Sequence, residues 1–232
     1  MNRQTDPLAR LDWDALSHEY FEDRRGRFTA AERRRVLETG IAAVAAMERI
    51  REAAQIEGAR GTTLVVGVGI AEVPLLVAQA RSGRRVVAWT RRAREARILA
   101  EFCAQGTPAA QLQIVAADAG RAPIPSGIDH LWIVSVLNDP TEFPALHDFY
   151  YQRAQPRTFS GSQFDADRRR ARALMGRLVA RLAPRAMVTL SDDAWPWLEE
   201  AAEATKRTIE ATERLWRAPL TRDPVRIAVV RR

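Results

Sequence analysis

The 232-residue sequence contains a single cysteine, Cys103, and only three histidines. One cysteine excludes an intrachain disulfide, a CxxC motif and a cysteine-rich zinc site. No two histidines stand at the spacing of metal ligands, so we expect no metal site. Cys103 lies in the stretch RILAEFCAQ, which is typical of the buried face of a helix, and we interpret it as a core residue.

Long apolar runs are absent as well. No stretch of about 18 apolar residues is present, so the sequence predicts no membrane span. The first residues, MNRQTDPLARLDWD, lack the apolar core of a secretion signal, and we expect a cytoplasmic protein without a membrane partner. A hydrophobic content of 47% and a charged content of 28% are typical of a globular chain.

Lysine is almost missing, because Lys206 is the only one and the net charge of +7 is carried by arginine. Clustered cations bind the phosphates of nucleic acids. The arginines of this chain are spread over several segments, and aromatic residues are not interleaved with them. Solvated helical faces explain this pattern better, so we do not expect a nucleic-acid partner.

The most informative stretch that is present is TTLVVGVGIAEVPLL, residues 62–76. β-prone residues lead into Gly67 and Gly69, and an apolar helical run follows with Pro74 in its opening turn. This order of strand, glycine turn and helix is typical of the first unit of a doubly wound α/β sheet. Such a turn brings backbone N–H groups close to a ligand, although two glycines after a strand also make an ordinary turn.

Strands and helices alternate after this unit, which predicts a doubly wound, mostly parallel α/β sheet with a C-terminal β-hairpin. The expected strands are residues 62–66, 85–90, 112–117, 131–136 and 186–190, and 208–215 pairs with 225–230 as the hairpin. The expected helices are residues 72–82, 92–105, 165–183 and 194–206.

Residues 1–60 are predicted to form an N-terminal helical cap, and residues 61–232 the Rossmann-like domain. Asp6-Pro7 begins a first helix, and Thr29 with Glu32 forms a capping box that opens a second. The second helix carries an apolar stripe of Leu37, Ile41, Val44, Met47 and Ile50. An aromatic-rich irregular insertion is expected at about 138–164. The cap covers either a substrate or simply an edge of the sheet.

Ligands of open parallel sheets bind beyond the carboxyl ends of the strands. The residues at those ends resemble the class I S-adenosylmethionine-dependent methyltransferases, through the glycine loop at 66–72 and the run from Val115 to Pro125. This resemblance implies S-adenosylmethionine as cofactor, with Asp118 accepting a hydrogen bond from the adenine amino group. The cofactor-binding residues that it implies are Gly67, Val68, Gly69, Ala71, Glu72, Thr90, Arg91, Asp118 and Ala119.

Two positions depart from the pattern of that family. Thr90 stands where the family usually has an acid that accepts the ribose hydroxyls, and Val65 replaces an acid in the first strand. A hydrogen bond to a charged group contributes about 1.5–3 kcal/mol, so these losses weaken the expected cofactor binding. They leave open a methyltransferase-like protein that binds a ligand or partner without methyl transfer.

An NADP-binding oxidoreductase is a further alternative, because Thr90, Arg91 and Arg92 suit a 2′-phosphate. Glu72, however, occupies the sixth position of the glycine loop. Its carboxylate would face a pyrophosphate at the helix N-terminus and repel it. S-adenosylmethionine has no phosphate, so Glu72 favours the methyltransferase interpretation.

The segment Asn138-Asp139-Pro140 is similar to a shortened Asn/Asp-Pro-Pro-aromatic motif of amino-directed methyltransferases. The resemblance implies that Asn138 and Asp139 lie near the transferred methyl group, although the same residues make a common turn. His147 is a candidate base. Phe143, Tyr150 and Tyr151 are candidates for the substrate pocket.

The sequence therefore predicts S-adenosylmethionine-dependent methyl transfer to a small-molecule acceptor. The segment around 138–150 also faintly resembles the aminopropyltransferases, which leaves that activity as a minor alternative. The sequence leaves the oligomeric state open, a homodimer included.

Overall fold

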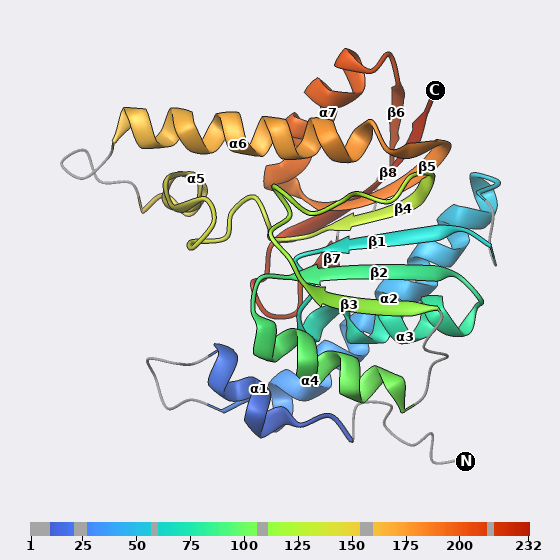
Figure 1. Ribbon diagram of the computed structural model, residues 1–232, viewed down its shortest axis with the longest axis vertical. Coiled ribbons are helices and arrows are strands. Elements are labelled where there is room, and N and C mark those ends of the chain that lie inside the picture. Colours follow the sequence, from blue (N-terminus) through green and yellow to red (C-terminus); the bar gives the residue numbers. More distant parts are fainter. Residues whose placement is uncertain (1–9, 21–26, 57–59, 106–110, 154–159, 213–215) are drawn as a thin grey trace. The chain divides into compact units, whose positions relative to one another are not determined.

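The computed structural model describes residues 10–20, 27–56, 60–105, 111–153, 160–212 and 216–232. The chain divides into two compact units, residues 1–118 and residues 119–232. The helices and strands of each unit are labelled in Figure 1. No helix among these residues is both long enough and apolar enough to cross a membrane.

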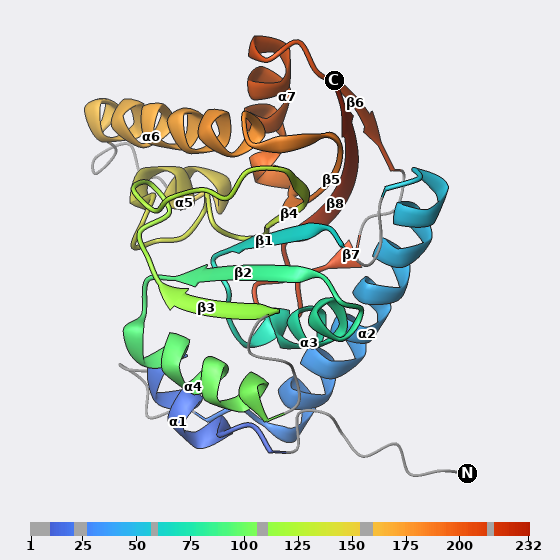
Figure 2. The same ribbon diagram turned by 45° about the vertical axis from the view of Figure 1, so that its right-hand side comes forward.

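The sheet of the first unit has three parallel strands in the order β3-β2-β1. They are β1 (Thr62–Val66), β2 (Arg85–Thr90) and β3 (Leu112–Ala116). Val66 lies opposite Trp89, and Thr90 lies opposite Ala116. All three strands therefore end at the same edge, as Figure 2 shows. The predicted bounds of β1 and β2 are confirmed, and β3 ends one residue earlier than predicted.

The helices of the first unit are α1 (Trp13–Tyr20), α2 (Ala30–Ala53), α3 (Val73–Arg81) and α4 (Ala93–Ala104). A 3-10 turn, η1 (Ile70–Glu72), precedes α3. The capping box is confirmed, because the Glu32 N–H donates to Thr29 Oγ1 at 3.2 Å and the Thr29 N–H donates to Glu32 Oε2 at 2.7 Å. The predicted helix start at Asp6-Pro7 lies outside the described residues.

The face of α2 that packs inward differs from the predicted stripe. Its buried residues are Val36, Gly40, Ala43 and Met47, whereas Ile41 is 56% exposed. A Cβ atom on Gly40 would lie 2.5 Å from Pro74 Cγ. Close approach of α2 to α3 therefore selects the face with small residues, and the prediction based on the largest apolar side chains was wrong at Ile41.

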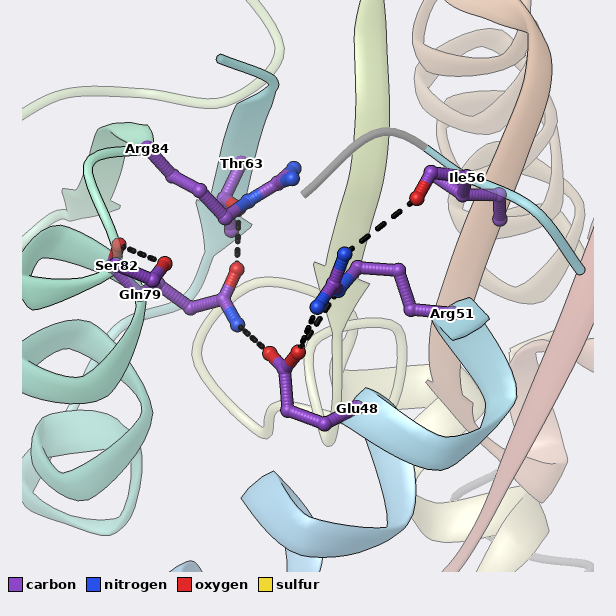
Figure 3. Close-up of polar contacts among 7 residues, drawn as sticks. All are labelled: Glu48, Arg51, Ile56, Thr63, Gln79, Ser82 and Arg84. Atoms are coloured by element: carbon purple, nitrogen blue, oxygen red, sulfur yellow. Dashed lines mark hydrogen bonds and ion pairs between the residues drawn. The ribbon is translucent and has the colours of Figure 1, made fainter. Parts of the chain in front are cut away.

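A polar network, buried at Thr63, Gln79 and Arg84 and partly buried at Glu48 and Arg51, joins α2 to the first strand of this sheet (Figure 3). Thr63 Oγ1 donates to Gln79 Oε1 and accepts from Arg84 Nε, both at 3.0 Å. Gln79 Nε2 in turn donates to Glu48 Oε1 at 3.0 Å, and Arg51 Nε donates to Glu48 Oε2 at 2.8 Å. Because buried polar groups are costly unless they are paired, this network fixes α2 on the unit.

The sheet of the second unit contains β4 (Ile128–Ile133) and β5 (Leu182–Ser191), which are parallel. β8 (Pro224–Arg231) is antiparallel to β5, and β6 (Thr208–Ala211) and β7 (Trp216–Arg217) are antiparallel to β8. The predicted C-terminal antiparallel ending is confirmed.

Strand β4 begins and ends three residues earlier than the predicted 131–136. Its apolar sequence continues beyond Ile133, but Ser135 has a φ of 56°. This left-handed conformation is incompatible with an extended strand. Strand β5 begins four residues earlier than predicted and contains Pro184, where its pairing with β4 has an irregular register.

The helices of the second unit are α5 (Pro144–Tyr150), α6 (Gly161–Val179) and α7 (Trp195–Ala204), with the 3-10 turn η2 (Asp192–Ala194) before α7. The stretch 138–164 is not irregular throughout, because α5 and the start of α6 lie in it. Pro144 occupies the first position of α5, where a proline is pre-organised for a helix. Ser160 caps α6 by accepting the Gln163 N–H at 3.3 Å.

Candidate functional site

The glycine turn lies at the carboxyl end of β1. Gly67 has a φ of 75°, in the left-handed region that favours glycine. The Val68 N–H donates to the carbonyl oxygen of Trp89 at 2.7 Å, which joins the turn to the last residues of β2. Gly67 is exposed, whereas Val68 and Gly69 are buried. The predicted glycine loop is therefore held tightly against the neighbouring strand.

The side chain of Glu72 binds a backbone N–H group of this loop. Its carboxylate Oε2 accepts the Gly69 N–H at 2.9 Å, and its side chain is 7% exposed. A pyrophosphate at this helix start would need the same N–H group and would meet a negative charge in a shielded place. The loop is therefore better suited to a ligand without phosphate.

The ends of β2 and β3 are also joined. The Ala117 N–H donates to the carbonyl oxygen of Thr90 at 2.8 Å, so Asp118 follows directly beside the end of β2. Asp118 is exposed. The glycine turn, Thr90 and Asp118 thus lie at one edge of the first unit's sheet, as the resemblance implies. Ala71 belongs to η1, and Arg91 is an exposed residue directly after β2.

The side chain of Thr90 has a partner that the sequence analysis missed. Thr90 Oγ1 donates to Glu95 Oε2 at 2.8 Å and accepts the Arg92 N–H at 3.3 Å. Glu95 lies in the first turn of α4 and is 3% exposed. A buried carboxylate thus stands beside the threonine that replaces the expected acid. In the sequence, Glu95 is a single acidic residue among arginines at the start of a helix, a pattern that is typical of a surface residue.

Ala119 is the first residue of the second unit. Its carbonyl oxygen accepts from Arg177 Nη1 at 3.3 Å, and Arg177 Nη2 donates to the carbonyl oxygen of Ala122 at 2.9 Å. Arg177 also donates to Gly120. This arginine of α6 therefore holds the backbone that follows Asp118.

A second group of polar residues gathers after β4, around a residue that the sequence analysis did not single out. Asp223, which directly precedes β8, is 6% exposed. Its Oδ1 accepts from the Tyr151 hydroxyl at 2.5 Å, and its Oδ2 accepts from the Ser135 hydroxyl at 2.5 Å and from Asn138 Nδ2 at 3.2 Å. Burial raises the pKa of Asp223, but hydrogen bonds from Ser135, Tyr151, Thr221 and Asn138 outweigh it and hold the pKa below its ordinary value.

We call Ser135, Asn138, Tyr151 and Asp223 the Asp223 cluster. Two of its members, Asn138 and Tyr151, were predicted site residues, whereas Ser135 and Asp223 were missed. Asp223 comes from a tight turn in which the Ala218 N–H donates to the Asp223 carbonyl oxygen at 2.8 Å. The sequence TRDP indicates only a turn. Nothing in it shows that the aspartate of a distant hairpin reaches the end of β4.

His147 lies beside this cluster. Its Nδ1 is 2.8 Å from the carbonyl oxygen of Asn138, which only accepts, and its Nε2 is 3.3 Å from Arg153 Nη1, which only donates. These two contacts fix the Nδ1–H tautomer and occupy both ring nitrogens. The geometry therefore gives His147 a positioning role, and its predicted role as a base stays a prediction.

Asp139 and the remaining aromatic residues have structural contacts. Asp139 Oδ1 accepts hydrogen bonds from the N–H groups of Thr141 and Glu142 at 2.8 and 3.0 Å. These bonds form a local turn, the alternative to a site at Asn138-Asp139-Pro140 that the sequence also allows. Phe143 is buried, and the Arg170 guanidinium carbon lies 5.0 Å from its ring centroid. The Tyr150 hydroxyl donates to the carbonyl oxygen of Asp193 at 2.9 Å. The predicted catalytic role of Asp139 and the pocket roles of Phe143 and Tyr150 stay predictions.

Asp193 is a second carboxylate that interacts with Asp223, and its pKa is shifted from the ordinary value. Burial raises the pKa of Asp193 to about 6, a hydrogen bond with Ser191 opposes the change, and the charge of Asp223 adds to it. Burial and the contact with Asp223 also raise the pKa of Tyr151. No group of three or more histidine, cysteine or acidic side chains in the described part of the chain is arranged to hold a metal ion.

No protein-family model matches the sequence, and no curated protein matches it either. Its fold is nevertheless similar to solved structures. One is the magnesium protoporphyrin IX methyltransferase ChlM from Synechocystis PCC 6803 with bound SAM, at a TM-score of 0.55 and 15% identity over 97% of this chain and 99% of that chain. The same enzyme with bound SAH gives a TM-score of 0.55 and 12% identity over 98% and 97% of the two chains.

The fold is that of the class I methyltransferases. The predicted α/β fold class is therefore confirmed. The N-methyltransferase NodS from Bradyrhizobium japonicum WM9 is also similar, at a TM-score of 0.48 and 12% identity over 75% of this chain and 86% of that chain.

Proposed function

We propose that the protein transfers a methyl group from S-adenosylmethionine to a small-molecule acceptor. The observation that carries the proposal is the edge of the first unit's sheet, where the glycine turn, the Thr90–Glu95 pair and Asp118 stand together and Glu72 occupies the loop amide that a phosphate would take. The comparison with ChlM, a methyltransferase with bound SAM or SAH, agrees with it.

The residues of the first unit would each bind one part of the cofactor. Asp118 would accept the adenine amino group, and the Thr90 hydroxyl with the Glu95 carboxylate would accept the ribose hydroxyls. Glu72 places a negative charge at the turn, which suits the positively charged sulfonium and ammonium groups. The remaining contacts from this unit would come from Gly67, Val68, Gly69, Ala71 and Arg91. The predicted cofactor contact of Ala119, which follows Asp118 in the chain, stays a prediction.

The bound cofactor supplies a methyl group on positively charged sulfur, which a nucleophile displaces in line. The protein contributes mainly position, because holding both reactants in line replaces an encounter in solution. We place the acceptor at the Asp223 cluster, which follows β4, since ligands of such sheets bind at the carboxyl ends of the strands. Asn138 and Tyr151 would contact it, with Asp139, His147, Phe143 and Tyr150 around them. A cytoplasmic location is part of the same proposal.

A ligand-binding protein without methyl transfer is the second candidate. The specific observation in its favour is that Asp139 and His147, the two predicted proton acceptors, are already engaged in a turn and in contacts with Asn138 and Arg153. Such a protein would bind the cofactor or its product, but no acceptor would be methylated.

Isothermal titration calorimetry with S-adenosylmethionine, S-adenosylhomocysteine and NADP tests the proposal. We expect both sulfur nucleosides to bind and NADP not to bind. Binding of NADP alone would support an oxidoreductase, and binding of none of the three would overturn the cofactor assignment. Methyl transfer from tritiated S-adenosylmethionine to a panel of small amines and alcohols separates the enzyme from the second candidate.

A further inference from the structure

The hydrogen bonds within the Asp223 cluster have a fixed direction. An ionised carboxylate only accepts, so every polar atom that contacts Asp223 must donate to it. The hydroxyl protons of Tyr151 and Ser135 therefore both point to Asp223, each over 2.5 Å. Neither hydroxyl has a second proton with which to donate to a ligand.

The direction of these two hydrogen bonds also determines which atoms donate in the neighbouring contacts. Thr221 Oγ1 lies 2.9 Å from Ser135 Oγ, and Thr221 also contacts the Asp223 carboxylate. The Ser135 proton is already used, so the one proton of Thr221 points to Ser135 or to Asp223 and is used within this group of residues in both cases. Asn138 Nδ2 also faces the carboxylate, at 3.2 Å from Asp223 Oδ2, and its second proton goes to the Tyr151 hydroxyl oxygen at 3.2 Å. The carboxylate thus assigns the orientation of the Asn138 amide as well.

The hydrogen-bonding capacity that remains is that of an acceptor. The Asn138 side chain is 5% exposed, both of its amide protons are used, and its Oδ1 accepts no hydrogen bond from the described residues. Ser135 and Tyr151 each keep one oxygen lone pair. An amide oxygen that accepts no hydrogen bond from the described residues is open to a donor from a ligand or from water.

The negative charge of the Asp223 cluster favours the same kind of ligand group, one that donates hydrogen bonds. Asp223 forms no ion pair with an arginine, lysine or histidine among the residues that the structure describes. Its carboxylate is balanced by neutral donors, and Asp193 is close enough for the two charges to interact. A partner that donates hydrogen bonds and is neutral or positive is favoured there, and an anion is disfavoured.

We infer that the Asp223 cluster binds a group that donates hydrogen bonds, an amine or a hydroxyl of a neutral or cationic small molecule, and rejects carboxylates. The recognising atoms are Asn138 Oδ1, Ser135 Oγ and the Tyr151 hydroxyl oxygen. The inference rests on the proposed function in that this group would belong to the methyl acceptor.

Three matched probes test it: benzylamine, benzyl alcohol and benzoate. Each is titrated into the full-length chain and followed by ¹H–¹⁵N NMR. We expect benzylamine and benzyl alcohol to shift the amide signals around Ser135 and Asn138, with benzoate bound at least about tenfold more weakly, the effect of one hydrogen bond to a charged group. Equal binding of the three probes, or tighter binding of benzoate, would overturn the inference.

The Asp223→Asn variant makes the test specific. An amide both donates and accepts, so it frees a hydroxyl proton of Tyr151 or Ser135 and removes the charge. We expect the preference for benzylamine over benzoate to fall about tenfold, whereas a purely structural role would weaken all three probes equally and would contradict the proposal. Glu210→Gln is the control, because it removes a charge from an exposed side chain of the same unit.

Tyr151→Phe covers the case in which Asp223→Asn does not fold. It keeps the ring and the Asp223 charge and frees Asp223 Oδ1 to accept a hydrogen bond, so the preference for benzylamine over benzoate should be retained or increase; loss of that preference would count against the inference. Calorimetry with S-adenosylhomocysteine on the same samples distinguishes the two proposals. If this nucleoside binds but the probes show no preference, only the inference fails. If the preference is present without nucleoside binding, only the proposed function fails.

Discussion

Single residues decide which ligand the glycine turn suits. Glu72 accepts the Gly69 N–H, and Glu95 accepts the Thr90 hydroxyl. Both carboxylates are buried and lie at the edge where β1 and β2 end. Glu72 makes the binding of a phosphate at the glycine turn unfavourable, and Glu95 places a negative charge next to the uncharged Thr90. Under the proposed function, Glu95, five positions further along the chain, would supply the carboxylate that is absent at Thr90.

Asp118 offers a direct test at this scale. We expect Asp118→Ala to weaken the binding of S-adenosylhomocysteine by about 1–3 kcal/mol, because the adenine amino group loses a hydrogen bond to a charged oxygen. Isothermal titration calorimetry measures the change. Asp165→Ala, at an exposed position of α6, is the control and should leave the affinity unchanged. An unaltered affinity for Asp118→Ala would refute the adenine assignment.

Asp193 predicts a dependence of stability on pH. Its pKa rises from an ordinary value of 3.8 to about 6 in the folded chain, mainly through burial. Between these two values the folded state binds more protons than the unfolded state, so this group's contribution to stability decreases as the pH rises from about 4 to about 6, and it stays lower above that range.

Asp193→Asn removes this titration. Relative to the unaltered chain, the variant's free energy of unfolding should therefore increase by about 1–3 kcal/mol between pH 4 and pH 7.5. Urea denaturation at the two pH values measures it. A difference between the two proteins that is the same at both pH values would show that Asp193 does not titrate in this range.

The sequence shows which residues end a strand, but it does not show which distant side chains meet them. The location of Gly67, Thr90 and Asp118 at one edge of the sheet could be predicted because each ends a parallel strand or follows one within two residues. Asp223 could not, since its position depends on how the hairpin between β7 and β8 folds back. The direction of the Glu95 side chain likewise depends on where α4 begins.

At the scale of elements, the contact between α2 and α3 depends on small residues. Gly40 has no room for a side chain, because an added Cβ would lie 2.5 and 2.7 Å from two carbons of Pro74. Strands β1 and β2 were predictable to the residue because apolar β-prone runs end at clear turns. The inward face of α2 was not, because hydrophobic periodicity favours large side chains and does not register a close helix–helix approach.

Gly40→Ala should destabilise the protein by about 1–3 kcal/mol through overpacking, despite the helix propensity that alanine adds. Gly176→Ala in α6 is the matched control, since nothing lies within 4 Å of its added Cβ. We expect this control to be neutral or stabilising by up to about 1 kcal/mol. Chemical denaturation of both variants measures the contrast, and equal effects would contradict the close packing of α2 on α3.

At the scale of the whole molecule, the two units are proposed to bind groups of different chemistry. The first unit would bind a nucleoside without phosphate, and the Asp223 cluster of the second unit would bind a group that donates hydrogen bonds. Gly67, Thr90 and Asp118 of the first unit, and Ser135 and Asn138 of the second, lie at or shortly after the carboxyl ends of parallel strands, where sheets of this kind bind ligands. The class of fold was readable from the sequence, because alternating strands and helices with a glycine turn permit few other arrangements.

A crystal structure of the protein with S-adenosylhomocysteine tests this claim most directly. We predict that the adenine amino group lies within about 3 Å of the Asp118 carboxylate and the ribose hydroxyls lie at Thr90 and Glu95, with the Glu72–Gly69 hydrogen bond retained. Electron density for the nucleoside at another edge of the sheet, or a Glu72 side chain displaced from the Gly69 amide to admit it, would contradict the account.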